Sequence, residues 1–358
     1  MGVNKHKGRN TMRTTIHPLT SSLAADDVLI IPGYGIVNSR QDVTVDAEIY
    51  SAPMDRVTGY ELAKEMLKHG GHPVLCRNIP EEEWLTAVQE LYEHPNFWIA
   101  VDGKLEMLEK LEKLGLCLNV AIDIAHGHSV QGVEAILKAK QSLNVHKIMS
   151  GSIATGDAAA ACIEAGATHL RVGIGPGSAC TTRLMTGCGI PQLTAVAIVA
   201  EVAKEYDTTV IADGGIKYPG DAAKYLVAGA HGFMMGNVFS KAIEAPGWIQ
   251  DGWEPLPDDT VVKFPLPEPT PIMKKHFRGH ASADFQSEHF GTPNRCPEGA
   301  SLPMFQWDGS TVIQILELYR GGLASACSYA GVTRSSELYR AQFIHNTTAA
   351  QQEAKPRG

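Results

Sequence analysis

The sequence predicts an α/β protein in which eight parallel strands close into a (β/α)8 barrel. Eight short apolar segments recur along the chain, each ending near Gly, Asp or Asn, and helical patterns lie between most of them. Buried strands that alternate with helices indicate a parallel sheet, and eight such units indicate a closed barrel. Polar and glycine-rich clusters follow most of the eight segments, which favours the barrel over an open sheet with one switch point.

The expected strands begin about a seventh of the way along the chain. Helical patterns such as YELAKEMLKHG and GDAAKYLVAGA separate them, and several of these patterns close with Gly, the usual residue at a helix C-terminus. In order, the strands are expected at residues 48–55, 72–78, 97–102, 118–127, 146–152, 169–177, 209–215 and 232–237.

The remaining segments define the expected domain organisation. Residues 1–13 are polar and basic without a following apolar core, so we expect a disordered extension and not a secretory signal. Residues 14–345 are expected to form one barrel domain, whose irregular residues 280–300 act as a mobile flap. The Pro-rich and acidic residues 251–276 are expected to be a surface excursion, and residues 346–358 a flexible tail.

Composition limits the classes of ligand and compartment. The net charge is −8, so the chain has no overall positive field to attract nucleic acid or an anionic membrane. We find no apolar run near the roughly 20 residues needed to cross a bilayer. The seven cysteines show neither a CxxC pair nor zinc spacing, which fits a reducing cytosol. We therefore expect a cytoplasmic protein that binds an anionic small molecule through backbone amides and a few arginines.

The strongest chemical signal is the segment VGIGPGSACTTRLMTGCGIPQLTAV at residues 172–196. Its glycines allow the backbone to turn sharply and approach a ligand closely. Exposed N–H groups in such a loop can hold an anion, and exposed carbonyls can hold a bare cation. Cys180 lies in this loop near Arg183, an electropositive setting that suits a nucleophilic thiolate. A phosphate-holding loop with an incidental cysteine is an equally good interpretation of the spacing alone.

Two further strand ends carry polar residues and glycines. Asp213 ends the seventh strand, where its carboxylate could accept hydrogen bonds from a ribose, and Gly214 and Gly215 follow it. Gly236 and Asn237 end the eighth strand. Each pair alone is typical of a tight turn, but barrels frequently bind phosphate after strands seven and eight. Their occurrence together therefore favours a phosphate site.

The 172–196 segment resembles the signature of the IMP dehydrogenase and GMP reductase family. The similarity extends through LAADDVLIIPGY, SAPMDRVTGYELA, AIDIAHGHS, RCPEGAS and GGLASACSYAG, and so covers nearly the whole chain. Members of that family form tetramers in which cofactor contacts cross between barrels. The resemblance therefore implies a homotetramer that acts on a purine mononucleotide.

The resemblance also implies a covalent mechanism. A cysteine at the place of Cys180 attacks C2 of the purine and forms a thioimidate, which divides one hard substitution into two easier steps. A dehydrogenase reaches this intermediate by giving a hydride from IMP to NAD and then hydrolyses it to XMP. A reductase reaches it by expelling ammonia from GMP and then accepts a hydride from NADPH, which yields IMP.

The family's functional residues carry over to this sequence by motif. Thr182 and Glu298 are expected to relay protons to the leaving amine. The carbonyls of Gly175, Gly177 and Cys180, with Arg183, resemble the family's potassium site. The implied nucleotide site consists of Ser178, Asp213, Gly214, Gly215, Gly236, Asn237, Gly279, His280, Ala281, Arg295 and Gly299. The implied cofactor site consists of Ser39, Arg40, Arg77, Asp123, Ile124, Ala125, Ile174, Gly175, Ser325, Cys327 and Ser328.

Three features favour the reductase reaction. The chain has no segment for the regulatory domain pair that typical dehydrogenases insert into the barrel. Its flap lacks the Arg-Tyr pair that activates the hydrolytic water, and NRCPEG places Arg295 three residues before Glu298, as in reductases. SACSYAG resembles the reductase's cofactor segment. We therefore expect an NADPH-dependent GMP reductase.

Other features keep three alternatives open. PGY, SAPMDRVT and IADGGIKYPGD resemble bacterial dehydrogenases, so a dehydrogenase without the regulatory insert is one alternative. Gly279-His280-Ala281 replaces the usual Gly-Met-Ser or Gly-Met-Gly, and Ala324 stands where reductases usually have Arg. These departures motivate the second alternative, a family variant acting on a modified purine nucleotide. A nucleotide-binding protein that has lost turnover is the third.

Overall fold

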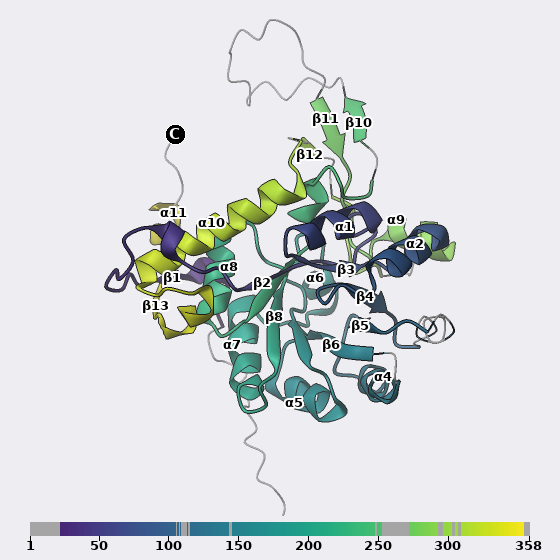
Figure 1. The fold of residues 1–358 in the computed structure, drawn as a ribbon, viewed down its shortest axis with the longest axis horizontal. Coiled ribbons are helices and arrows are strands. Elements are labelled where there is room, and N and C mark those ends of the chain that lie inside the picture. The colour runs from purple at the N-terminus through teal and green to yellow at the C-terminus, as the bar shows by residue number, and fades with distance from the viewer. Residues whose placement is uncertain are drawn as a thin grey trace, which may run out of the picture.

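The computed structural model contains the predicted closed barrel of eight parallel strands (Figure 1). The structure describes residues 22–353 except 105, 107, 109–112, 114, 143–144, 248, 253–271, 293–295, 303–304 and 307–308. Strand β9 pairs with β2 and closes the barrel, with Ile49 beside Phe233. The barrel strands are β2 (Glu48–Ser51), β3 (His72–Leu75), β4 (Trp98–Val101), β5 (Leu118–Asp123), β6 (Val145–Ile153), β7 (His169–Val172), β8 (Thr209–Asp213) and β9 (Gly232–Met235).

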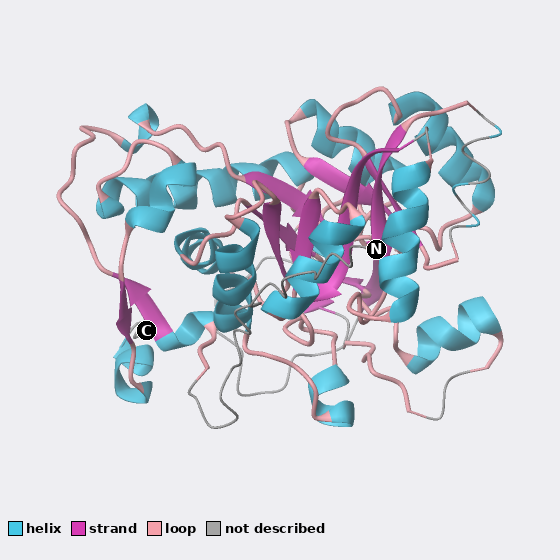
Figure 2. Ribbon diagram, turned by 90° about the horizontal axis from the view of Figure 1, so that it is seen from below, coloured by secondary structure: helices cyan, strands magenta, loops and turns pink. Residues whose placement is uncertain are grey.

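Helices surround these strands, which form the centre of the molecule (Figure 2). Local sequence fixes several helix ends. Thr155 caps the helix that begins at Gly156, because its hydroxyl accepts a hydrogen bond from the N–H of Ala158 at 3.2 Å, and Gly166 ends that helix in the left-handed region. The helices are α1 (Tyr60–Lys68), α2 (Glu81–Leu91), α4 (Val130–Gln141), α5 (Gly156–Ala165), α6 (Thr182–Thr186), α7 (Gln192–Ala203), α8 (Pro219–Val227), α9 (Ala283–Phe290), α10 (Val312–Ala330) and α11 (Thr348–Glu353).

Short elements complete the fold outside the barrel. β1 (Val28–Ile30) pairs antiparallel with β13 (Phe343–His345), which brings the two ends of the described chain together. β10 (Ile249–Gly252), β11 (Ile272–Lys275) and β12 (Phe305–Gln306) form a three-stranded sheet that projects from the body (Figure 1). The 3-10 helices are η1 (Ala25–Asp27), η2 (Arg40–Asp42), η3 (Phe239–Lys241) and η4 (Ser335–Arg340).

The barrel interior is filled by side chains. Tyr50, Trp98, Met149, Ile211 and Met234 point into it, and each is at most 1% exposed. A second, larger core lies between the strands and the surrounding helices. The packed barrel interior leaves no room for a ligand between the described strands, and in barrels the active site lies above the C-terminal ends of the strands.

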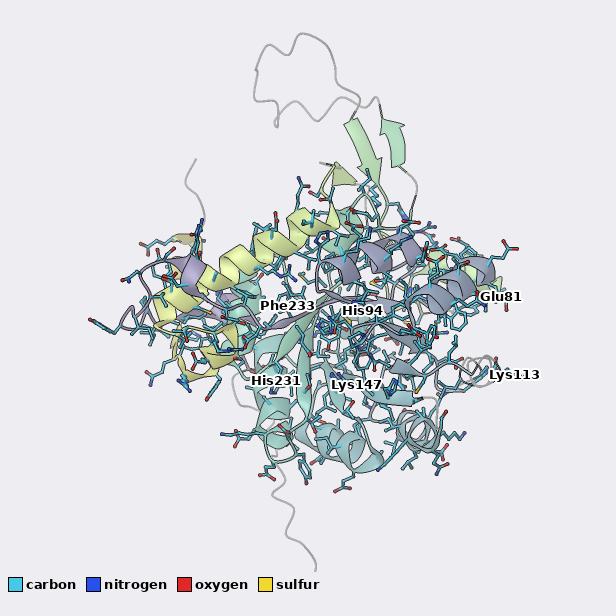
Figure 3. The ribbon with its side chains drawn as sticks, in the orientation of Figure 1. Glu81, His94, Lys113, Lys147, His231 and Phe233 are labelled. Atoms are coloured by element: carbon cyan, nitrogen blue, oxygen red, sulfur yellow. The ribbon has the colours of Figure 1, made fainter. Side chains whose placement is uncertain are left out.

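Titratable side chains gather at the opposite end, where the strands begin. The His169 ring lies 4.8 Å from Trp98 in an edge-to-face arrangement. Burial lowers the pKa of His72 and of His169 to about 4, so both rings are neutral at pH 7. Lys147 and His231 lie at the same end of the barrel (Figure 3).

Two segments differ from the sequence expectation. The flap region is expected from sequence to be irregular, but it contains α9, which begins after Ser282 because that hydroxyl accepts a hydrogen bond from the N–H of Phe285 at 3.3 Å. The expected tail contains α11, and the preceding Asn346 is buried and donates its N–H to Asp27 O at 2.7 Å. Residues 1–13 and most of 251–276 lie outside the described residues.

No helix in the described part of the chain combines the length and apolar character of a membrane-crossing segment.

Candidate active site

A cavity of about 550 Å³ opens at the C-terminal ends of the barrel strands. Residues from the ends of β2, β5, β7, β8 and β9 line it, together with residues that precede and follow α9. The predicted site residues that share this cavity are Asp123, Ala125, Ile174, Gly175, Gly177, Ser178, Cys180, Thr182, Asp213, Gly214, Gly215, Gly236, Asn237, Gly279, His280, Ala281, Glu298 and Gly299.

The loop after β7 presents Cys180 to this cavity. Cys180 is exposed, and its thiol donates to Thr182 Oγ1 at 3.3 Å. The Arg183 side chain joins the two ends of this loop, because its Nε donates to Ile174 O at 3.0 Å and its Nη2 donates to Ile190 O at 2.6 Å. A Cβ at Gly175, whose φ is +84°, would lie 2.5 Å from Cγ of Arg183. Glycine is therefore required for the arginine to occupy this position.

Backbone hydrogen bonds place the flap against the cysteine loop. The N–H of Thr181 donates to Glu298 O at 2.8 Å, and the N–H of Ala300 donates to Ala179 O at 2.8 Å. On its other side the same segment bonds to the chain before α9, because the N–H of Gly279 donates to Ala300 O at 3.1 Å. The segment 298–300 thus lies between two loops, and Glu298 enters the cavity beside Cys180.

The turn after β8 is built for close backbone approach. Gly214 and Gly215 have φ of +84° and +73°, the left-handed region that favours glycine. Asp221 stabilises the start of α8, because its Oδ2 accepts hydrogen bonds from the N–H groups of Lys217 and Tyr218 at 2.9 and 3.0 Å. Lys217 and Lys241 line the cavity here, which gives this side a positive potential suited to phosphate.

A row of alternating charges crosses the floor of the cavity. Arg171 on β7 is 5% exposed, and its Nη2 donates to Asp123 Oδ1 at 2.8 Å, while its Nε lies 3.7 Å from Asp213 Oδ2. Arg77 Nε lies 3.9 Å from the other oxygen of Asp123. Burial raises the pKa of Asp213 to about 6 although Arg171 opposes the shift. Burial would raise the pKa of Asp123, but the charges of Arg171 and Arg77 and the hydrogen bond from Arg171 outweigh it, so the pKa of Asp123 is lowered.

His280 occupies the cavity wall as a neutral ring. Its Nε2 accepts a hydrogen bond from the N–H of Asp55 at 2.9 Å, so the proton resides on Nδ1. Burial lowers the pKa of His280, against the attraction of Asp123 and Asp55. The ring stacks on Phe285 of α9, with centroids 4.5 Å apart. This histidine therefore joins the barrel loop after β2 to the flap helix.

An ion-pair network fixes the same helix. Arg278 is 3% exposed and its Nη2 lies 2.6 Å from both Asp55 Oδ2 and Glu288 Oε2. Arg56 Nη2 also approaches Glu288 at 3.6 Å. Because Glu288 belongs to α9, the network connects the flap helix to the barrel rim.

Several predicted cofactor residues lie elsewhere. Arg40 and Ser325 line a second cavity of about 780 Å³ between η2 and α10, and Arg40 Nη1 donates to Ser325 Oγ at 3.5 Å. Ser39 caps η2, and Ser328 is half-buried on α10. Cys327 is a correction: its side chain is 0% exposed in the core, so it cannot contact a cofactor. Arg77 and Ile124 adjoin Asp123 in space and in sequence, and Arg295 lies outside the described residues.

Comparison with known proteins decides the family. The sequence model of the IMP dehydrogenase / GMP reductase domain matches residues 22–357. The chain belongs to this family.

Named members of the IMP dehydrogenase / GMP reductase family match over different lengths. The chain is 38% identical to the inosine-5'-monophosphate dehydrogenases of Chlorobaculum tepidum and Methanocaldococcus jannaschii, over 66% of this chain and 47% and 48% of theirs. It thus spans about half the length of these dehydrogenases. It is 32% identical to the GMP reductase of Klebsiella pneumoniae, over 90% of this chain and 94% of that protein.

Sequence reasoning missed three cationic residues of the cavity, Arg171, Lys217 and Lys241. A signal for Arg171 was present, because His169 and Arg171 alternate with the apolar Leu170 and Val172 along β7. Such alternation places the polar pair on one face of a strand, which in a barrel is the interior or the rim. Lys217 and Lys241 lie in turns, where a charged residue carries no orientation signal.

Proposed function

We propose that this protein is a GMP reductase-type oxidoreductase, which converts GMP, NADPH and a proton to IMP, ammonia and NADP+ in purine nucleotide interconversion. The observation that carries the proposal is the placement of Cys180, Thr182 and Glu298 at one cavity above the barrel strands. The two lysines beside the glycine turn after β8 suit a mononucleotide phosphate.

The architecture of the barrel supports the reductase branch. The longest connection between two successive barrel strands, residues 173–208, holds the cysteine loop, α6 and α7. No such connection has room for an inserted domain pair. The nearly full-length match to a GMP reductase supports the same branch.

The residues divide the reaction into two steps. In the first, Cys180 Sγ forms a bond to C2 of guanine, the bond from C2 to the exocyclic nitrogen breaks, and ammonia leaves with a proton relayed by Thr182 and Glu298. When bound, NADPH supplies the hydride that C2 receives in the second step. The bond from C2 to sulfur then breaks and Cys180 leaves as thiolate, which produces IMP.

The implied cofactor and cation have suitable residues. Asp123 in the cavity and the adjacent Arg77 are the groups that would hold NADPH. The carbonyls beside Cys180 would hold K+. The Arg183 side chain supports the loop, because it bonds two loop carbonyls. The Arg183 carbonyl, like that of Gly177, accepts one backbone N–H and keeps a second lone pair for a cation. K+ would neutralise carbonyl dipoles and fix the loop.

The test is turnover of the purified protein in potassium buffer. We expect GMP to cause oxidation of NADPH with equimolar ammonia and IMP, and a Cys180→Ala variant to be inactive. Wild-type protein that consumes no NADPH with GMP contradicts the proposal. We further propose a homotetramer, which light scattering after size exclusion tests directly, and a cytoplasmic location, which cell fractionation tests.

Two alternative activities have specific support. The 38% identity to dehydrogenases favours conversion of IMP and NAD to XMP, and formation of XMP would identify it. His280 in the cavity wall favours a modified purine nucleotide, because a ring replaces the usual methionine near the base. A panel of GMP, dGMP, IMP and modified guanine nucleotides with oxidised and reduced cofactors separates the three activities.

A further inference from the structure

The buried guanidinium of Arg171 lies between two carboxylates that line the cavity, those of Asp123 and Asp213. It projects from β7 between Asp123 at the end of β5 and Asp213 at the end of β8. A Cβ at Gly151 would lie 2.6 Å from Cβ and 2.7 Å from Nε of Arg171, so the glycine in β6 provides the space for this side chain. The barrel therefore provides the space for the guanidinium, and Asp123 and Asp213 hold its head group there.

The surroundings leave Arg171 as the main counter-charge of both carboxylates. Asp213 faces Arg171 and, across it, Asp123. Asp123 faces Arg171, Arg77 after β3, and His280 before α9. Each carboxylate would repel the other without the intervening cation, and a partly buried carboxylate that has lost its counter-charge takes up a proton more readily.

We propose that Arg171 is a positioning residue that holds Asp213 ionised for the nucleotide ribose and links it to Asp123 on the dinucleotide side, so that the two substrates bind cooperatively. The inference rests on the proposed function for the roles of Asp213 and Asp123. Ordering either carboxylate orders the shared guanidinium, and the second ligand then meets a partner that is already fixed. The coupling must act equally in both directions.

The first measurement is the pH dependence of mononucleotide affinity, by calorimetry with GMP, IMP and XMP from pH 5 to 8. An opposite charge within about 4 Å lowers a carboxylate pKa by roughly 1–3 units. We therefore expect Arg171→Met to move the acidic limit of binding upward by roughly 1–3 pH units, and Arg171→Lys to leave it near the wild-type position. Asp123→Asn should move the limit downward, because Asp123 raises the pKa of Asp213.

The second measurement is the coupling itself. IMP with NADPH is a non-reacting pair, so NADPH fluorescence can be titrated with and without IMP. We expect IMP to tighten NADPH binding at least about fivefold in the wild type. This ratio of NADPH affinities with and without IMP should fall in Arg171→Lys, which keeps the positive charge but loses the planar guanidinium. It should approach one in Arg171→Met. Arg334→Met removes a 2.9 Å pair with Asp46 outside the cavity and serves as the matched control with unchanged coupling.

The outcomes distinguish this inference from the proposed function. A wild type that binds none of the three nucleotides refutes both. Nucleotide binding by Arg171→Met with the wild-type pH profile and wild-type coupling refutes the inference alone. If Arg171→Met does not unfold cooperatively, it is not properly folded, and Arg171→Lys becomes the test. Wild-type coupling between IMP and NADPH in Arg171→Lys then overturns the proposal.

Discussion

Acid should destabilise this protein through His169, and the effect can be isolated by one substitution. The pKa of this buried ring is about 4 in the folded chain, against 6.5 as its ordinary value. Because the unfolded chain binds a proton at His169 more readily than the folded chain does, the fold has its full stability above pH 6.5. It loses stability as the pH falls toward 4. Linkage with these two values gives a loss of about 2 kcal/mol by pH 5 and about 3 kcal/mol by pH 4.

The assay is urea unfolding followed by circular dichroism at several pH values between 7.5 and 4.5. His169→Gln should lose about 2 kcal/mol less than the wild type between pH 7.5 and 5, because the titrating ring is absent. Asp213 acts in the opposite sense, since burial raises its folded pKa to about 6, but it is common to both proteins and cancels in the difference. His126→Gln, an exposed site, is the control. Parallel curves for wild type and His169→Gln would refute the reasoning.

Three further tests, the last of which compares two substitutions, examine the support of the cavity. Arg278→Met leaves Asp55 buried without its main partner and should cost about 3–5 kcal/mol in urea unfolding, and a cost below 1 kcal/mol would contradict the buried pair. Glu288→Gln removes the half-exposed end of the same network. We expect a loss of less than about 1 kcal/mol in the free energy of unfolding but a raised KM for the nucleotide. An unchanged KM would exclude a role of Glu288 in positioning the flap. Gly175→Ala should abolish turnover and Gly187→Ala should not, because both have positive φ but only the first Cβ meets the Arg183 side chain. Equal activities would contradict this steric argument.

The barrel was predictable because its signal is repetitive. Eight apolar runs with helices between them specify the sheet regardless of errors at individual boundaries, and the structure confirms all eight strands. The cavity's backbone turns were also visible, because clustered glycines at strand ends are typical of sharp turns and of close approach to a ligand. Signals for α9 existed in the cap Ser282 and in Gly291, but a helix of eight residues gives too weak an apolar pattern to outweigh the polar composition.

Errors arose where one residue's orientation decided its role. Family resemblance assigns Cys327 to a cofactor segment, yet it lies four residues after Leu323, and both face the core from α10. Helical periodicity alone would have separated Cys327 from the accessible Ser325 and Ser328. Arg171 was missed because the alternation along β7 places His169 and Arg171 on the same face but does not say which face lines the barrel.

The attachment of the flap through main-chain groups has a consequence for variation in this protein. Alignment of Glu298 with Cys180 depends on N–H and C=O groups of residues 279–281 and 298–300, which every residue except proline supplies in full. Side chains that face the cavity from this strip can therefore change while the main-chain bonds beside the proposed catalytic pair remain. Under the proposed function, selectivity for different bases can thus be altered at Ala281, whereas a change at His280 also removes the hydrogen bond from Asp55 and the stack on Phe285.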